Sequence, residues 1–236
     1  MQTNIVGHRG LSGHYPENTK ASILAAIESG LKWIEIDIQP TKDGQLVVIH
    51  DHTIDRCSNG SGRVDSFTLA ELQQFDFGAW YHDDFAGEPI LTFSELLDLA
   101  KYYDLSLNIE VKLDTDCAIS VVNTMQQQLE LVNIDKGKLL LSSFSDAVIR
   151  QLSLQCPDYC LGVIGNKLTE QQLQLLQETN AFSCHLNYKY ITAEDIETLK
   201  YQGYQVWCFT VNQPEQFPLL DEVDAIFSDF PLKFIK

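Results

Sequence analysis

Short, strand-like apolar runs alternate with amphipathic segments of helical period along nearly the whole chain. The runs read NIVGH, WIEIDIQ, LNIEVK, LLLSSF, CLGVIG, FSCHLN, VWCFTV and AIFSD. Strands that alternate with helices pair in parallel, because each helix carries the chain back across the sheet. Eight such units close into a barrel, so the pattern predicts an α/β chain with the TIM (β/α)8 fold. A doubly wound open sheet is the alternative, which the lack of a G-x-G-x-x-G motif after the first run disfavours.

The segments between these runs carry start and stop signals for helices. N-cap signals stand at Asn18-Thr19, at Thr92 and at Thr169, and the last two have Glu or Gln three residues on, which makes capping boxes. Glycine commonly follows the last turn of a helix. We therefore expect one helix to end at Gly30, and another, at about residues 193–202, to end at Gly203.

One segment interrupts the alternation. After the second run, TKDGQLVVIHD contains a turn and a returning strand, which predicts a hairpin from Gln39 to His50. The stretch that follows, residues 51–88, is rich in loop-forming residues. We interpret residues 45–88 as a small insertion after the second strand, on the rim of one catalytic barrel domain that spans residues 1–236. We expect it to wall one side of the active site.

The charge of the chain limits its partners. Its 236 residues carry a formal net charge of −17, which disfavours nucleic acid or an anionic membrane surface as partner. A small anionic substrate stays compatible with this charge, because a local cation reverses the potential inside a cleft. No apolar run approaches the ~20 residues that cross a bilayer, so we expect no stable membrane insertion.

The cysteines indicate a reducing compartment. The six of them show no C-x-x-C pairing of the kind that binds zinc, which favours free and mostly buried thiols. Strand-like sequence begins by about residue 4, which leaves no room for a cleavable signal. We expect a cytoplasmic protein. Its oligomeric state is open, with a homodimer as one option.

Acidic side chains share one face of two expected strands. In WIEIDIQ, Glu35 and Asp37 lie on one face and the isoleucines on the other, and Glu110 has the same inward position in NIEVK. Carboxylates that converge in a barrel need a shared proton or cation, and oxygen ligands suit Mg²⁺ or Ca²⁺ better than zinc. The alternative is that these acids are exposed, or that Glu110 pairs with Lys112. The recurrence of the pattern in two strands favours a metal site.

Two histidines stand where a TIM barrel gathers its chemistry. His8 and His50 each follow a strand-like run, and together they suggest a general acid and base, since imidazole titrates near neutral pH. Arg9 offers a planar fork for phosphate or carboxylate. It also has a structural interpretation, a salt bridge to Glu17, and the two agree if Glu17 orients Arg9. The remaining histidines are interpreted as structural or surface residues: His14, His52, His82 and His185.

Taken together, these motifs resemble the glycerophosphodiester phosphodiesterase family. The resemblance rests on HRG with PENT downstream, then EID, VVIHD and NIEVK, in this order and spacing. It continues through DHTIDRCSNGSGRV, SSFS, a W-x-x-T-x-N motif that begins at Trp207, and SDFP near the end. It therefore covers nearly the whole chain.

The resemblance implies a TIM barrel with a rim insertion after the second strand, in agreement with the pattern described above. It also implies a role for each residue that matches the motifs. These roles are divalent-metal ligands at Glu35, Asp37 and Glu110, an acid–base pair at His8 and His50, and phosphate contacts at Arg9 and Lys112.

Two positions depart from the pattern of the family. His52 stands where Pro is frequent, and Ser228-Asp229 stands where Thr-Asp is frequent. We expect neither to touch the metal or acid–base residues, although His52 could alter the rim. Trp207 has two interpretations, a wall for the glycerol carbons or core packing. Asn18 also has two, a hydrogen bond near the metal or a helix cap.

The resemblance implies that one divalent cation, Mg²⁺ or Ca²⁺, assists hydrolysis of a small glycerophosphodiester to an alcohol and sn-glycerol 3-phosphate. We expect the glycerol 2-hydroxyl to attack phosphorus and form a cyclic phosphate, with attack by water as the alternative. A lysophospholipid or sphingomyelin lipase would need an apolar trough, for which only the aromatic residues of the insertion are available. A non-catalytic binding module is disfavoured by the complete set of acids, histidines and basic residues.

Overall fold

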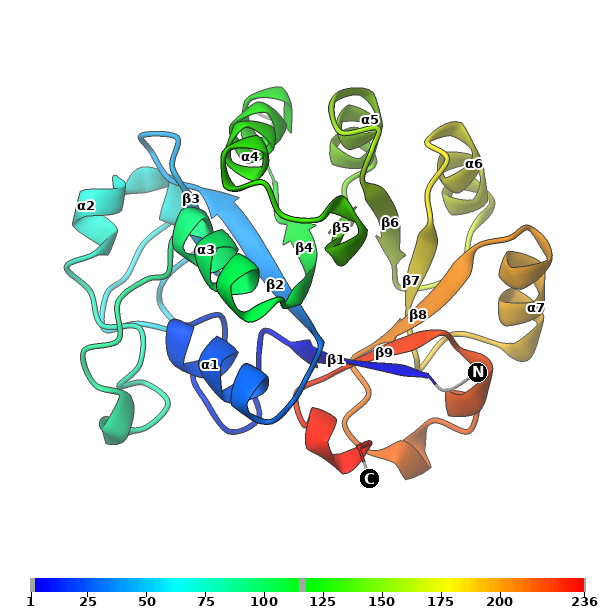
Figure 1. The fold of residues 1–236 in the computed structure, drawn as a ribbon, viewed down its shortest axis with the longest axis horizontal. Helices are drawn as coiled ribbons and strands as arrows, with labels where there is room; N and C mark the ends of the chain where they lie inside the picture. The colour runs from blue at the N-terminus through cyan, green and yellow to red at the C-terminus, as the bar shows by residue number, and fades with distance from the viewer. Residues whose placement is uncertain (1–2, 115–117, 236) are drawn as a thin grey trace.

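The computed structural model describes residues 3–114 and 118–235, and Figure 1 shows a barrel of strands ringed by helices. In this part of the chain, eight parallel strands form a closed barrel in the order β1-β2-β4-β5-β6-β7-β8-β9, and β9 pairs with β1. They are β1 (Asn4–His8), β2 (Trp33–Pro40), β4 (Ser106–Val111), β5 (Leu139–Ser143), β6 (Cys160–Gly165), β7 (Ser183–Asn187), β8 (Gln205–Phe209) and β9 (Ala225–Ser228). Each predicted run forms one of these strands. The TIM barrel is confirmed and the open sheet was wrong.

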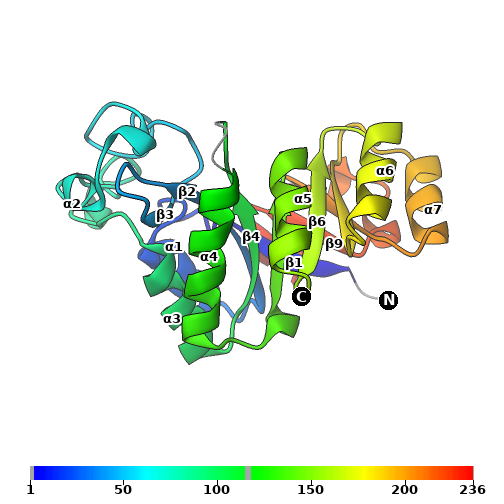
Figure 2. The same ribbon diagram turned by 90° about the horizontal axis from the view of Figure 1, so that it is seen from above.

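The α-helices lie outside the barrel, and Figure 2 shows α4 to α7 standing side by side along one flank. They are α1 (Lys20–Glu28), α3 (Phe93–Tyr103), α4 (Ala118–Val132), α5 (Asp146–Gln155), α6 (Glu170–Glu178) and α7 (Ala193–Tyr201). Thr92 and Thr169 cap α3 and α6 as predicted, and of the pair Asn18-Thr19 it is Thr19 that caps α1. Between β8 and β9 the described chain forms short 3-10 turns, at Pro214–Gln216 and Leu220–Glu222, in place of an α-helix.

Strand alternation separates the main core from the barrel interior. Ile34, Ile36 and Ile38 of β2 are fully buried and belong to the apolar layer between barrel and helices. Glu35 and Asp37, on the opposite face, are also buried, but they face the interior. The interior has its own small apolar cluster, which contains Val6, Leu140, Trp207, Ala225 and Phe227. This cluster fills the barrel next to the polar site.

The insertion forms a small lobe beside the barrel, drawn in cyan at the left of Figure 1. Its strand β3 (Leu46–Val48) pairs antiparallel with β2, which confirms the predicted hairpin. The lobe also contains the short helix α2 (Leu69–Leu72). It has an apolar cluster of its own, formed by Val47, Ile49, Ile54, Val64, Leu72, Phe77 and Ile90, with Phe67, Leu69 and Phe75 against it. Its aromatic residues therefore serve largely as packing.

Among the described residues, no helix is long and apolar enough to cross a bilayer. Five cysteines are described and all are free thiols: Cys57, Cys156, Cys160, Cys184 and Cys208. Cys117, the sixth, lies outside the described residues. The cytoplasmic location and the homodimer stay predictions.

Gly10 forms the turn after β1 with a φ of +85°, and a Cβ at this position would lie 2.9 Å from the carbonyl carbon of Ser22. Gly30 has nearly the same φ, +86°, with open space around its Cβ position. We expect Gly30→Ala to lower the free energy of unfolding by about 1–2 kcal/mol through left-handed strain. Gly10→Ala should lower it further, because α1 must also shift. Chemical denaturation measures both, and equal losses would contradict a constraint from Ser22.

Candidate active site

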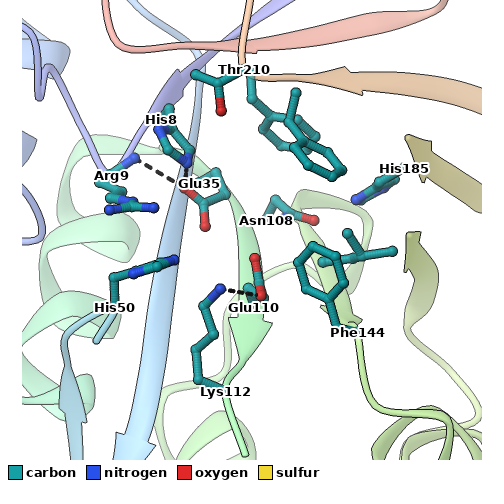
Figure 3. Close-up of a pocket in the computed structure, with 13 residues that line it drawn as sticks. His8, Arg9, Glu35, His50, Asn108, Glu110, Lys112, Phe144, His185 and Thr210 are labelled. Carbon is teal, nitrogen blue, oxygen red and sulfur yellow. Dashed lines mark hydrogen bonds and ion pairs between the residues drawn. The ribbon is translucent and has the colours of Figure 1, made fainter. Parts of the chain in front are cut away.

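A pocket opens at the carboxyl ends of the barrel strands, with a cavity volume of about 140 Å³. Figure 3 shows charged side chains at one end of it and aromatic side chains at the other. The pocket is lined by His8, Arg9, Glu35, His50, Asn108, Glu110, Lys112, Phe144, Ile164, His185, Phe209, Thr210 and Phe227. Most of the residues predicted for the site therefore meet in one place.

The three predicted metal ligands converge. Glu35 and Asp37 come from β2 and Glu110 from β4, and the register of the two strands places Asp37 beside Glu110. One carboxylate oxygen from each lies within 4.8 Å of the other two, and all three side chains are buried. Within the described ranges, Oε1 of Glu35 is buried without a hydrogen-bond partner.

Burial makes this cluster of acids costly when all three are ionised. It raises the pKa of Glu35 well above its usual value, and the charges of Asp37 and Glu110 raise it further. Burial and the Asp37 charge likewise raise the pKa of Glu110 to about 7. Burial alone would also raise the pKa of Asp37, but Lys112 and Arg9 lower it to about 2. A bound cation would relieve this repulsion, so the donor set fits Mg²⁺ or Ca²⁺.

Two basic residues partly neutralise the acids. The Arg9 backbone N–H donates to Glu35 Oε2 at 3.0 Å, and its guanidinium lies 3.5 Å from Asp37 and 2.7 Å from Glu17. Lys112 Nζ lies 2.6 Å from Glu110 Oε1 and 3.4 Å from Asp37 Oδ1. The ion pairs of Arg9 with Glu17 and of Lys112 with Glu110, which the sequence offered as structural interpretations of these residues, are thus present. Both basic side chains also line the pocket, where they can meet an anion.

Each candidate acid–base histidine is held by its own aspartate. His8 Nδ1 lies 2.6 Å from Asp229 Oδ1, and His50 Nδ1 lies 2.6 Å from Asp51 Oδ1. The hydrogen bond from Arg56 and the bond from His50 lower the pKa of Asp51, so its carboxylate accepts the Nδ1–H of His50. Burial lowers the pKa of His50, which favours the neutral ring. The ring then presents its Nε2 lone pair as a base. Figure 3 shows both imidazoles directed into the pocket.

The contact between Asp229 and His8 contradicts our expectation that Ser228-Asp229 lies apart from the acid–base residues. The two residues are 221 positions apart, and they meet because β9 pairs with β1 with Gly7 opposite Ser228. Asp229 Oδ2 also accepts a hydrogen bond from Asn212 Nδ2 at 2.7 Å. The motifs W-x-x-T-x-N and SDFP contain Asn212 and Asp229. They did not reveal that Asp229 meets His8 where β9 pairs with β1.

Asn18 and Glu17 lie around the cluster of acids. Asn18 Nδ2 donates to Asp37 Oδ2 at 2.9 Å, whereas Thr19 caps the following helix. The structure therefore places Asn18 beside the candidate metal site. Glu17 binds Arg9 and also accepts two hydrogen bonds from Arg56, at 2.7 and 2.8 Å.

Arg56 was not selected from the sequence, although the structure gives it a central place. Its Nε donates to Asp51 Oδ2 at 2.7 Å while its two Nη atoms bind Glu17. One side chain of the insertion thus joins the partner of His50 to the partner of Arg9. The DRCSNGSGR stretch contained this residue, but loop sequence gives no direction for its side chain.

Trp207 does not line the pocket. It is 3% exposed and stacks on His185 with ring centroids 5.1 Å apart, while Phe144 and Phe209 form the apolar wall. Among the other histidines, His14 and His82 are exposed, and His52 Nδ1 contacts Gln39 Oε1 at 2.7 Å. His185 differs from them, because it is fully buried and lines the inner end of the pocket.

Sequence comparison connects this arrangement to known proteins. The model of the glycerophosphoryl diester phosphodiesterase family matches residues 8–233. A glycerophosphodiester phosphodiesterase of Caldanaerobacter subterraneus subsp. tengcongensis is 34% identical over 98% of this chain and 96% of its own. Another, from Bacillus altitudinis, is 32% identical over 99% of this chain and 97% of its own.

Solved structures agree with this match. A phosphodiesterase of Oleispira antarctica, in complex with the product sn-glycerol-3-phosphate, superimposes with a TM-score of 0.95 at 29% identity. The match covers 99% of this chain and 95% of that one. A glycerophosphodiester phosphodiesterase of Agrobacterium tumefaciens has a TM-score of 0.82 at 24% identity, covers 99% of each chain, and shows the shared fold.

We expect Arg56→Ala to lower kcat about 10- to 100-fold, because Asp51 and Glu17 lose the residue that positions them. Arg63→Ala is the matched control: Arg63 also lies in the insertion, is similarly exposed, and binds two carboxylates, Asp65 and Asp114, that do not line the pocket. Steady-state kinetics and thermal unfolding of both variants measure the effect. Equal kcat values in the two variants would exclude a positioning role for Arg56.

Proposed function

This chain belongs to the glycerophosphoryl diester phosphodiesterase family, and we propose that its pocket hydrolyses glycerophosphodiesters to an alcohol and sn-glycerol 3-phosphate. It is a phosphodiesterase of the hydrolase class. One observation carries the proposal: buried acids, two basic residues and two aspartate-held histidines converge in a single pocket. The bound product in the Oleispira relative supports the same substrate class.

We assign the cation to the cluster of acids. Glu35, Asp37 and Glu110 would hold one divalent ion, and the unpartnered, buried oxygen of Glu35 supports this assignment. Bound there, the ion supplies positive charge that stabilises the phosphate oxygens during reaction. The oxygen-only donors suit Mg²⁺ and Ca²⁺ alike.

Arg9 and Lys112 bind the substrate phosphate. They lie beside the acids and face the pocket, so their charges meet the non-bridging phosphate oxygens as negative charge develops. Glu17 fixes the Arg9 guanidinium by an ion pair of 2.7 Å. This constraint aims the guanidinium before the substrate arrives.

His8 and His50 transfer the protons. In the first step, one Nε2 removes the proton of the glycerol 2-hydroxyl, whose oxygen forms a bond to phosphorus. The bond from phosphorus to the alcohol oxygen breaks, and the other histidine protonates that oxygen. In the second step, water adds to phosphorus and opens the cyclic phosphate, with the roles of the histidines reversed. Asp229 and Asp51 keep both rings oriented throughout.

We expect Glu35→Gln, Asp37→Asn and Glu110→Gln each to lower kcat at least about 100-fold and to weaken Mg²⁺ and Ca²⁺ binding, because each removes an anionic ligand. Glycerophosphocholine turnover and isothermal titration with each metal measure the two effects. Glu95→Gln, in the capping box of α3, is the matched control, since Gln also caps. Full turnover by EDTA-treated protein would overturn the metal assignment.

A substrate analogue tests the nucleophile. Replacing the 2-hydroxyl of glycerophosphocholine by hydrogen removes the attacking group but keeps the phosphodiester. Since an intramolecular nucleophile reaches an effective molarity of ~10⁵ M or more, we expect the analogue to inhibit competitively and to be barely hydrolysed. Competition kinetics and choline release measure this. Hydrolysis at a rate near that of glycerophosphocholine would instead identify water as the nucleophile.

A further inference from the structure

The pocket has a second end that the proposed chemistry does not use. In Figure 3, His185 lies on the side away from Arg9 and His50, and the side chains around it include Asn108 and Phe144. His185 comes from β7 and Asn108 from β4, so they approach the pocket from different parts of the barrel. His185, Asn108 and Phe144 themselves carry no carboxylate, guanidinium or ammonium group. This inner end is therefore suited to a neutral part of a substrate.

Two buried polar atoms at this end lack partners. Within the described chain, Asn108 Oδ1 and His185 Nδ1 have no hydrogen bond, although their residues are only 1% and 0% exposed. The other polar atom of each side chain is satisfied: Asn108 Nδ2 donates to Ser142 Oγ at 3.1 Å, and His185 Nε2 lies 2.8 Å from Ser183 Oγ. Figure 3 shows the Asn108 oxygen directed toward His185. Buried polar atoms are rarely left unpaired, so this pair points to a ligand.

The His185 ring is held firmly in this position. It stacks on Trp207 with an interplanar angle of 7°, and its ring centroid lies 5.2 Å from that of Phe227. Gly162 leaves room for it, because a Cβ there would lie 2.6 Å from His185 Cε1. Burial also lowers the pKa of His185 to about 3, so the ring is neutral at ordinary pH. The ring packing and the contact of Nε2 with Ser183 account for the rest of the side chain, which leaves the Nδ1 atom to be explained.

We propose that His185 and Asn108 form a subsite for the terminal hydroxyl of the glycerol moiety. A hydroxyl both donates and accepts, so it can donate to Asn108 Oδ1 and also bond to His185 Nδ1. With the phosphate beside Arg9, the glycerol carbons extend along Phe209 toward this inner end. The inference rests on the proposed function and adds a cause of specificity: the pair selects glycerol over alcohols that lack the third oxygen.

A pair of substrates tests the subsite. One is glycerophosphocholine, and the other carries a 2-hydroxypropyl group in place of glycerol, so that it loses the terminal hydroxyl and keeps the 2-hydroxyl. We expect the wild type to favour glycerophosphocholine about 10-fold or more in kcat/KM, because the analogue leaves two buried polar atoms unpaired. In His185→Phe this preference should fall to about twofold or less, because kcat/KM for glycerophosphocholine decreases. His14→Phe, the same change at an exposed position, should keep the wild-type preference.

A second variant keeps the test decisive. Asn108→Leu preserves the size of the side chain and removes the acceptor, so it should reduce the same preference even if His185→Phe fails to fold. Near-ultraviolet circular dichroism verifies the fold of each variant. Equal kcat/KM for the two substrates in the wild type, or an unchanged preference in a folded variant, would overturn the subsite. Failure of the wild type to hydrolyse glycerophosphocholine or glycerophosphoethanolamine would overturn the proposed function instead.

Discussion

The burial of three carboxylates inside the barrel is the constraint on which the site depends. Arg9 contacts Glu35 and Asp37, and Lys112 contacts Asp37 and Glu110. One carboxylate oxygen of each acid also lies within 4.8 Å of those of the other two. Unpaired buried charge is strongly unfavourable, so basic groups must be present even in a chain of net charge −17. The same groups that make the acids tolerable are therefore those able to attract a phosphate. Folding and the proposed substrate binding therefore use one set of charges.

Around this centre, charge alternates outward in layers. The acids meet Arg9 and Lys112, Arg9 meets Glu17, and Glu17 meets Arg56. The histidines follow a similar rule, since each ring is backed by an aspartate that is itself hydrogen-bonded, by Asn212 in one case and Arg56 in the other. Such layering fixes side chains by several contacts each, so the polar site is ordered without an apolar core of its own.

The sequence predicted what depends on local periodicity. The two-residue alternation of WIEIDIQ and NIEVK placed the acids in the barrel, and strand ends located His8 and His50, because these patterns follow from backbone geometry alone. The contact of Asp229 with His8 needed the closure of β9 on β1, which no local pattern encodes. The contacts of Arg56 with Asp51 and Glu17 depended on the path of a loop. The depth of Trp207 and His185 in the barrel depended on packing between β7 and β8, where His185 pairs with Trp207.

The candidate site is divided between the barrel and the insertion. The acids, both basic residues and His8 belong to the strands of the barrel or follow them directly, whereas His50 and Arg56 follow β3, on the added lobe. The eight βα units alone therefore carry the residues proposed to hold the cation and the phosphate ester, but only one of the two histidines proposed to transfer protons. The proposed recognition residues thus belong to the scaffold, whereas turnover as proposed also needs the hairpin of β2 and β3, which brings a second imidazole across the rim.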